Sequence, residues 1–113
     1  MAKKSLFKNY SFTFDKNEKK VLTTFCKQAL KQMYGNPELA KQAAIFDSIL
    51  KKLESDEEEI KLTKNEKYVL TSSLKENVKF LKNKTESSSF FTKWFYKSVL
   101  KQYVNLIENH FED

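Results

Sequence analysis

The string KNEKKVLT at residues 16–23 returns as KNEKYVLT at residues 64–71, with one mismatch and an offset of 48 positions. A short alternating segment precedes each copy, Phe12-Thr13-Phe14 in the first case and Ile60-Lys61-Leu62 in the second. Alternation of apolar and polar residues is typical of a half-buried strand. A repeat of this length indicates a supersecondary unit that the chain uses twice.

The residues that join each alternating segment to its string predict a helix start. Asp15 is followed three positions later by Glu18, and Thr63 is followed in the same way by Glu66. This is the capping-box pattern, in which the cap oxygen and the Glu carboxylate accept hydrogen bonds from otherwise unpaired helix amides. We therefore expect helices over about 16–34 and 64–83.

Two further helices are predicted downstream of these. Gly35 can end the first helix in a left-handed conformation, and Asn36-Pro37 can cap and start a second helix that runs to about Glu54. A fourth helix, from about Phe90 to Phe111, follows the polar segment 84–89. The predicted inward-facing residues are Leu22, Phe25, Cys26, Ala29, Leu30 and Met33 in the first helix, Leu39, Ala43, Phe46, Leu50 and Leu53 in the second, and Val69, Leu70, Leu74, Val78 and Leu81 in the third.

These elements predict a mainly α fold of four helices within a single domain, 1–113. We expect two tandem strand–helix–helix repeats with pseudo-twofold symmetry, over about 11–54 and 60–111, joined by the acidic linker 54–59. A lone strand leaves its backbone groups unpaired, so the two short strands are expected to form a small antiparallel ribbon. The alternative is a plain four-helix bundle in which both segments are extended lead-ins.

Composition supports long helices and a basic surface. The 113 residues include one Gly and one Pro, which leaves few turn residues for a many-stranded sheet. The net charge of +6 raises the expectation of a polyanionic partner, but all 21 cationic side chains are lysines. Lysine lacks the flat, forked donor by which arginine recognises phosphate and guanine, so the basic charge could equally reflect composition alone.

The residue types that carry catalysis are sparse. A single glycine, Gly35, rules out a glycine-rich phosphate loop. Cys26 lies on the predicted apolar stripe of the first helix, so we interpret it as a small core residue, and His110 stands three residues from the end. The acidic linker lacks the glycine of a calcium loop. We therefore expect no enzyme, no cofactor and no metal site.

Cysteine use and hydropathy favour the cytoplasm. With Cys26 alone, no intramolecular disulfide can form, which suits a reducing compartment. The start of the chain, residues 1–7, carries lysines but no apolar stretch behind them, so no secretory signal is expected. No apolar run approaches the roughly 20 residues that span a bilayer.

Two surfaces are candidates for binding. The fourth helix has more aromatic residues than one core-facing stripe requires, and a protein interface is predicted at Phe90, Trp94, Tyr96 and Tyr103. The alternative interpretation places these aromatics in the core. Lysines spaced by four residues could instead follow a phosphate backbone, and the nucleic-acid residues would be Lys75, Lys79, Lys93, Lys97 and Lys101.

The leading hypothesis is a non-enzymatic accessory or regulatory protein that binds another protein or a second copy of itself as a homodimer. The alternative is a lysine-driven nucleic-acid-binding protein without sequence preference. A role at a membrane surface ranks below both. The repeated motif accounts for two helix starts and matches no functional signature.

Overall fold

The computed structural model describes residues 9–87 and 90–111, and the side chains of residues 85–96 are not described. The elements in chain order are β1 (Asn9–Phe12), α2 (Lys16–Met33), the 3-10 turn η1 (Pro37–Leu39), α3 (Ala40–Leu53), β2 (Ile60–Thr63), α4 (Lys64–Ser87) and α5 (Phe90–His110). The described part of the chain is thus mainly helical with a two-stranded ribbon, as the sequence predicts. The chain divides into two compact units, Met1–Leu70 and Thr71–Asp113, and each is described by itself.

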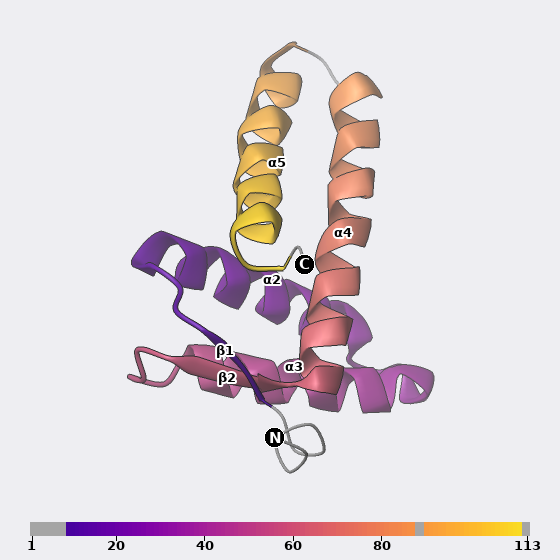
Figure 1. Cartoon of the computed structure of the whole chain (residues 1–113). Coiled ribbons are helices and arrows are strands. Elements are labelled where there is room, and N and C mark those ends of the chain that lie inside the picture. The colour runs from indigo at the N-terminus through magenta and orange to yellow at the C-terminus, as the bar shows by residue number, and fades with distance from the viewer. Residues whose placement is uncertain (1–8, 88–89, 112–113) are drawn as a thin grey trace. The chain divides into compact units, whose positions relative to one another are not determined.

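In unit 1, helices α2 and α3 pack against each other and β2 contacts α3 (Figure 1). The rings of Phe25 and Phe46 meet edge to face with centroids 6.3 Å apart, which joins the two helices. The turn between them requires a left-handed residue, and Gly35 supplies it at φ 84°. Asn36 then accepts a hydrogen bond from the amide of Glu38 at 3.1 Å, and Pro37 begins η1. The predicted second helix therefore exists, with a 3-10 first turn.

The ribbon is antiparallel, as predicted, but β1 lies earlier than expected. Phe12 stands opposite Ile60 and Tyr10 opposite Leu62, so the ladder runs back to Asn9 and does not reach Phe14. In this register the partner of Phe14 would be Glu58, in the acidic linker. The amide of Asp15 is also committed to the helix cap, where it donates to Glu18 at 3.0 Å. Phe14 stays buried and stacks on Phe12 with ring centroids 5.4 Å apart.

Both predicted capping boxes are confirmed. At α2, Asp15 Oδ1 accepts from the amide of Glu18 at 2.7 Å, which completes the reciprocal pair. At α4, Thr63 Oγ1 accepts from the amide of Glu66 at 3.1 Å, and the amide of Thr63 donates to Glu66 Oε1 at 2.9 Å. The helices begin where these local hydrogen bonds satisfy the first free amides.

The core of unit 1 contains most of the predicted residues, with one shift on α3. Leu22, Phe25, Cys26 and Leu30 of α2 are buried, whereas Ala29 and Met33 are partly exposed. On α3 the buried residues are Phe46, Ile49 and Leu53. The expected stripe placed Leu50 inside, but Ile49 is fully buried and Leu50 is partly exposed. The buried stripe of α3 therefore consists of residues 46, 49 and 53, which are spaced by three and then four positions.

Unit 2 consists of the second part of α4 together with α5, which runs antiparallel beside it (Figure 1). Helix α4 extends to Ser87 and so passes through part of the predicted polar break at 84–89. Buried residues on its described part in this unit are Leu74 and Leu81, and those near the end of the chain are Tyr103, Leu106, Ile107 and Phe111. Among the described residues, no helix is long and apolar enough to cross a membrane.

Candidate functional site

A buried carboxylate joins α3 to the start of α4 in unit 1. Glu66 is only 6% exposed, yet it is a charged residue. Ser48 Oγ donates to Glu66 Oε2 at 2.5 Å, and Lys52 Nζ donates to Oε1 at 2.6 Å. The amide of Thr63 is the third donor. All three surround one carboxylate, so a charge that would be costly to bury alone is paired and hydrogen-bonded.

These contacts also set the protonation of Glu66. Burial by itself raises the pKa of the carboxyl, because the charged form loses water. The hydrogen bonds from Lys52, Ser48 and Thr63 and the charge of Lys52 act in the opposite direction and prevail, so the pKa lies below its usual 4.5. Glu66 is therefore a carboxylate at neutral pH, already bound by its own chain. We assign it a structural role.

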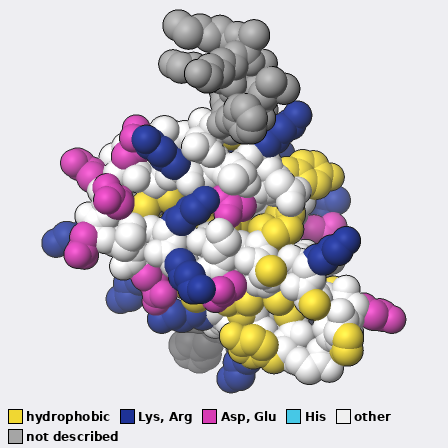
Figure 2. Space-filling view, turned by 90° about the horizontal axis from the view of Figure 1, so that it is seen from below, with side chains coloured by type: hydrophobic (Ala, Val, Ile, Leu, Met, Phe, Trp, Pro, Cys, Tyr) yellow, Lys and Arg dark blue, Asp and Glu magenta, His cyan; other side chains and the backbone are white. Residues whose placement is uncertain are grey.

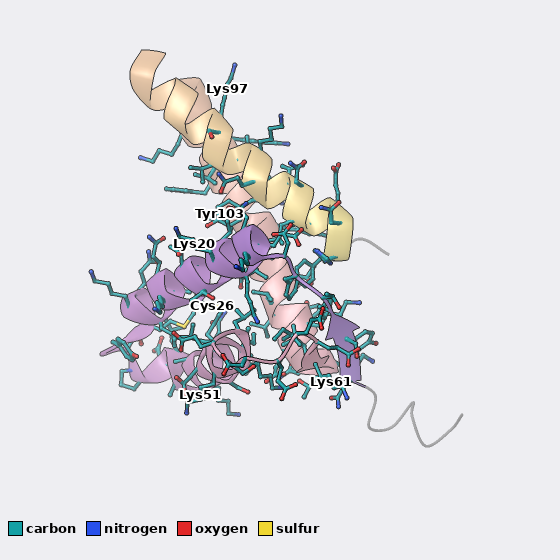
Figure 3. The ribbon with its side chains drawn as sticks, turned by 90° about the vertical axis from the view of Figure 1, so that its left-hand side faces the viewer. Lys20, Cys26, Lys51, Lys61, Lys97 and Tyr103 are labelled. Carbon is teal, nitrogen blue, oxygen red and sulfur yellow. The ribbon has the colours of Figure 1, made fainter. Side chains whose placement is uncertain are left out.

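The thiol of Cys26 is inside unit 1, as predicted. The residue is fully buried on α2, and in Figure 3 its sulfur lies between α2 and α3. Burial raises the pKa of this thiol to about 12. The nucleophilic form is the thiolate, so Cys26 is inert as a nucleophile at neutral pH.

An open apolar hollow lies at the turn between α2 and α3. Its volume is about 560 Å³, and its lining includes Leu30, Met33, Tyr34, Pro37, Ala40 and Ala44. The side chain of Tyr34 is 73% exposed at this place. Small alanines on the first turns of α3 leave the space, and Gly35 and Pro37 set the turn that borders it. On the face seen in Figure 2, hydrophobic side chains gather at the lower right, and charged side chains of both signs occupy the left-hand part.

Two other large apolar side chains of the described residues are exposed, and both belong to α4. Tyr68, in unit 1, is 70% exposed, and Phe80, in unit 2, is 56% exposed. The ammonium of Lys84 lies 5.6 Å from the centroid of the Phe80 ring. Neither residue belongs to a surface that the sequence predicts. The available signal was that both positions fall outside the predicted inward stripe of that helix.

The described structure includes the side chain of one residue of the predicted aromatic interface on the last helix, Tyr103. Tyr103 is buried, with 8% of its surface exposed, so it belongs to the interior rather than to a contact surface. The side chains of Phe90, Trp94 and Tyr96 lie outside the described residues. Tyr103 lies three to four residues before Leu106 and Ile107, and this spacing places it on their buried face.

The predicted basic surface is partly visible. Lys75 and Lys79 on α4 and Lys97 and Lys101 on α5 are exposed, and Lys97 extends away from α5 in Figure 3. The side chain of Lys93 lies outside the described residues. The described part of the chain holds no cluster of three or more His, Cys, Asp or Glu side chains that could bind a metal ion.

Comparison of the chain with models of protein families, with curated proteins and with solved structures finds no match. The function must therefore be argued from the surfaces described above.

Proposed function

We propose that this protein is a non-enzymatic accessory or regulatory factor that acts by binding a protein, and that the α2–α3 hollow is its contact surface. The observation that carries the proposal is Tyr34, a large aromatic side chain 73% exposed beside an apolar hollow of about 560 Å³. Aromatic residues are enriched at protein interfaces, and tyrosine is among the residues that most often carry the binding energy. The hollow is proposed in place of the last helix because Tyr103 is buried and the side chains of Phe90, Trp94 and Tyr96 lie outside the described residues.

The partner that we propose is a second copy of the chain. A twofold contact uses the same patch on both partners, so the patch must be self-complementary, and a protruding group beside a recess satisfies this condition. The α2–α3 turn has both, since Tyr34 projects beside a recess lined by Met33, Pro37 and Ala44. In the homodimer each Tyr34 ring enters the hollow of the other copy.

The test is the mass of the protein in solution as a function of concentration. Sedimentation equilibrium of the wild type should show a dimer that dissociates on dilution. Tyr34→Ser should weaken it at least tenfold, since truncating an anchor residue costs about 2 kcal/mol or more. Tyr68→Ser is the matched control, because Tyr68 is an equally exposed tyrosine on another helix, and it should leave the dimer unchanged.

A monomer at every concentration would refute the homodimer. A dimer that both substitutions leave intact would show that the contact lies elsewhere on the chain.

The tandem repeats and their pseudo-twofold relation are also part of our proposal. Their support is local: both capping boxes form, and Phe12 stands opposite Ile60, the residue 48 positions later that the repeat makes its equivalent. If the two starts are equivalent, Asp15→Thr, which gives the first cap the residue of the second, should change the free energy of unfolding by less than about 0.5 kcal/mol. We further propose a cytoplasmic location, which fractionation of the host cells would test.

A second candidate function is charge-driven binding of nucleic acid through Lys75, Lys79, Lys93, Lys97 and Lys101. It is favoured by the distribution of charge along the sequence. Residues 75–101 hold seven lysines and two glutamates, a net charge of +5, while the whole chain carries +6. Nearly all of the net positive charge thus lies in one segment. A gel-shift titration over a salt series tests this function, since phosphate contacts weaken steeply with salt.

A further inference from the structure

The segment that carries the excess charge also carries an exposed aromatic ring. Phe80 is 56% exposed in unit 2. On the same helix Lys75, Lys79, Lys82 and Lys84 are all exposed. Glu76 is the acidic side chain one turn before Phe80. This ring lies outside the core, whose α4 residues in this unit are Leu74 and Leu81.

The spacing of these side chains suits a flexible polyanion. Lys75, Lys79 and Lys82 recur at intervals of four and three residues, so they follow one side of the helix over about 10 Å. Lys84 lies one turn after Phe80, and its ammonium is 5.6 Å from the ring centroid. Lys84 is therefore the cation beside the ring, whereas Phe80 lies roughly 100–160° around the helix from Lys75, Lys79 and Lys82, so a strand that contacts both must cross the helix obliquely. This combination of a basic track with an aromatic platform is how proteins hold single strands without reading their sequence.

We infer that the exposed face of α4 in unit 2 binds single-stranded nucleic acid, with the lysines against phosphates and a base stacked on Phe80. This inference rests on the second candidate function and adds the strandedness of the ligand and the role of the ring. In a duplex the bases are stacked inside, so Phe80 would find only the backbone. In a single strand the base faces are free to stack on an aromatic side chain.

A lipid surface fits these residues less well. Binding to a bilayer needs a continuous apolar helix face set into the headgroup region. On α4 the apolar stripe is already used, because Leu74 is fully buried and Leu81 is 6% exposed. One exposed ring offers a membrane little area. One ring is enough to stack a base.

The experiment measures fluorescence anisotropy of a labelled oligothymidylate of about 20 nucleotides, longer than the ~4–16 nucleotides of a typical single-strand site. A duplex of equal length and vesicles of phosphatidylcholine with phosphatidylserine are the competing probes. The full chain should bind the single strand more tightly than the duplex. Its affinity should fall with salt, with a slope of about −0.7 per phosphate contact.

Substitutions separate the ring from the charge. Phe80→Leu keeps an apolar side chain but removes the π-face, and it should weaken single-strand binding roughly tenfold without changing the salt slope. Phe80→Trp keeps a π-face, so it should bind the single strand about as tightly as the wild type does. Lys79→Gln should lower the salt slope instead. Tyr68→Leu is the control, since it removes an exposed ring from the same helix outside the basic segment, and circular dichroism verifies that each variant is folded.

Two results would overturn the inference while leaving the second candidate function in place: duplex binding as tight as single-strand binding, or wild-type affinity in Phe80→Leu. Absence of salt-sensitive binding to either nucleic acid would refute both the inference and the second candidate function. Binding to the vesicles without binding to oligothymidylate would assign the surface to lipid and refute the inference.

Discussion

Replacing Glu66 by glutamine tests whether the buried carboxylate holds unit 1 together. Glutamine has nearly the same shape and keeps one oxygen for the amide of Thr63. It removes the negative charge that Lys52 contacts at 2.6 Å. It also leaves one acceptor oxygen where the carboxylate offers two, one to Lys52 and one to Ser48. The substitution therefore changes the electrostatics of the cluster while its packing stays almost constant.

The expected loss is about 2 kcal/mol in the free energy of unfolding. Removing one partner of a buried ion pair costs roughly 3–5 kcal/mol, and hydrogen bonds to charged groups contribute about 1.5–3 kcal/mol. The side chain of Lys52 is 35% exposed, so its ammonium can turn to water and recover part of that cost. At the size of this chain, about 2 kcal/mol lowers the melting temperature by roughly 8 °C.

Glu18→Gln is the matched control, because Glu18 occupies the same position of the other capping box. Its carboxylate accepts from the amide of Asp15, and its side chain is partly exposed, so the expected loss is below about 0.5 kcal/mol. Urea unfolding followed by circular dichroism measures both variants. Equal stability of Glu66→Gln and Glu18→Gln would show that the buried network contributes nothing beyond the cap.

The same pair of variants predicts a pH dependence. The pKa of Glu66 is lowered in the folded protein, so the unfolded chain takes up the proton first as the pH falls. The stabilisation is fully present above the unfolded value of about 4.5 and is lost as the pH falls below it. The difference between wild type and Glu66→Gln should shrink with acidification, and a constant difference from neutral pH to well below that value would contradict the assignment.

Three further predictions concern single positions. Thr71→Val should leave stability unchanged or raise it by up to about 1 kcal/mol in thermal unfolding, because Thr71 Oγ1 is buried and makes no hydrogen bond; a loss of similar size would reveal a bonded hydroxyl. Cys26 should resist a thiol reagent in the native protein at neutral pH and react at the rate of unfolding, so fast native labelling would disprove its burial. Gly35→Ala should cost about 1 kcal/mol in urea unfolding because φ is 84°, although a Cβ would meet no atom within 4 Å; an unchanged midpoint would mean that the turn relaxes.

The helix starts could be predicted because their chemistry is local. Asp15 with Glu18 and Thr63 with Glu66 specify the cap within four residues, and the hydrogen bonds form as expected. The antiparallel pairing of the two alternating segments was also predictable. Its extent was not, because the ladder continues to Asn9 on one side and stops on the other where it would meet the acidic linker.

Burial depends on distant parts of the chain, so a local motif does not specify it. The same motif places Glu18 at a partly exposed position and Glu66 in the interior, since Ser48 and Lys52, one helical turn apart on α3, reach Glu66. The aromatic excess of the last helix left both an exposed surface and a core position open, and Tyr103 is buried. Phe80 falls outside the predicted inward stripe of its helix, whereas the exposure of Tyr34 beside a hollow depends on how α2 and α3 pack.

The connection between α3 and β2 is fastened at both of its ends. Ser48 and Lys52 hold Glu66 across it, and Lys19 donates to the carbonyl oxygens of Ser55 and Glu57 at 3.4 and 3.1 Å. Extra residues inserted after Glu58 would leave all of these anchors in place, and doubling such a loop costs only about 0.6 kcal/mol of closure entropy. A fluorescent tag or an affinity peptide can therefore be inserted at this bend while the fold is kept.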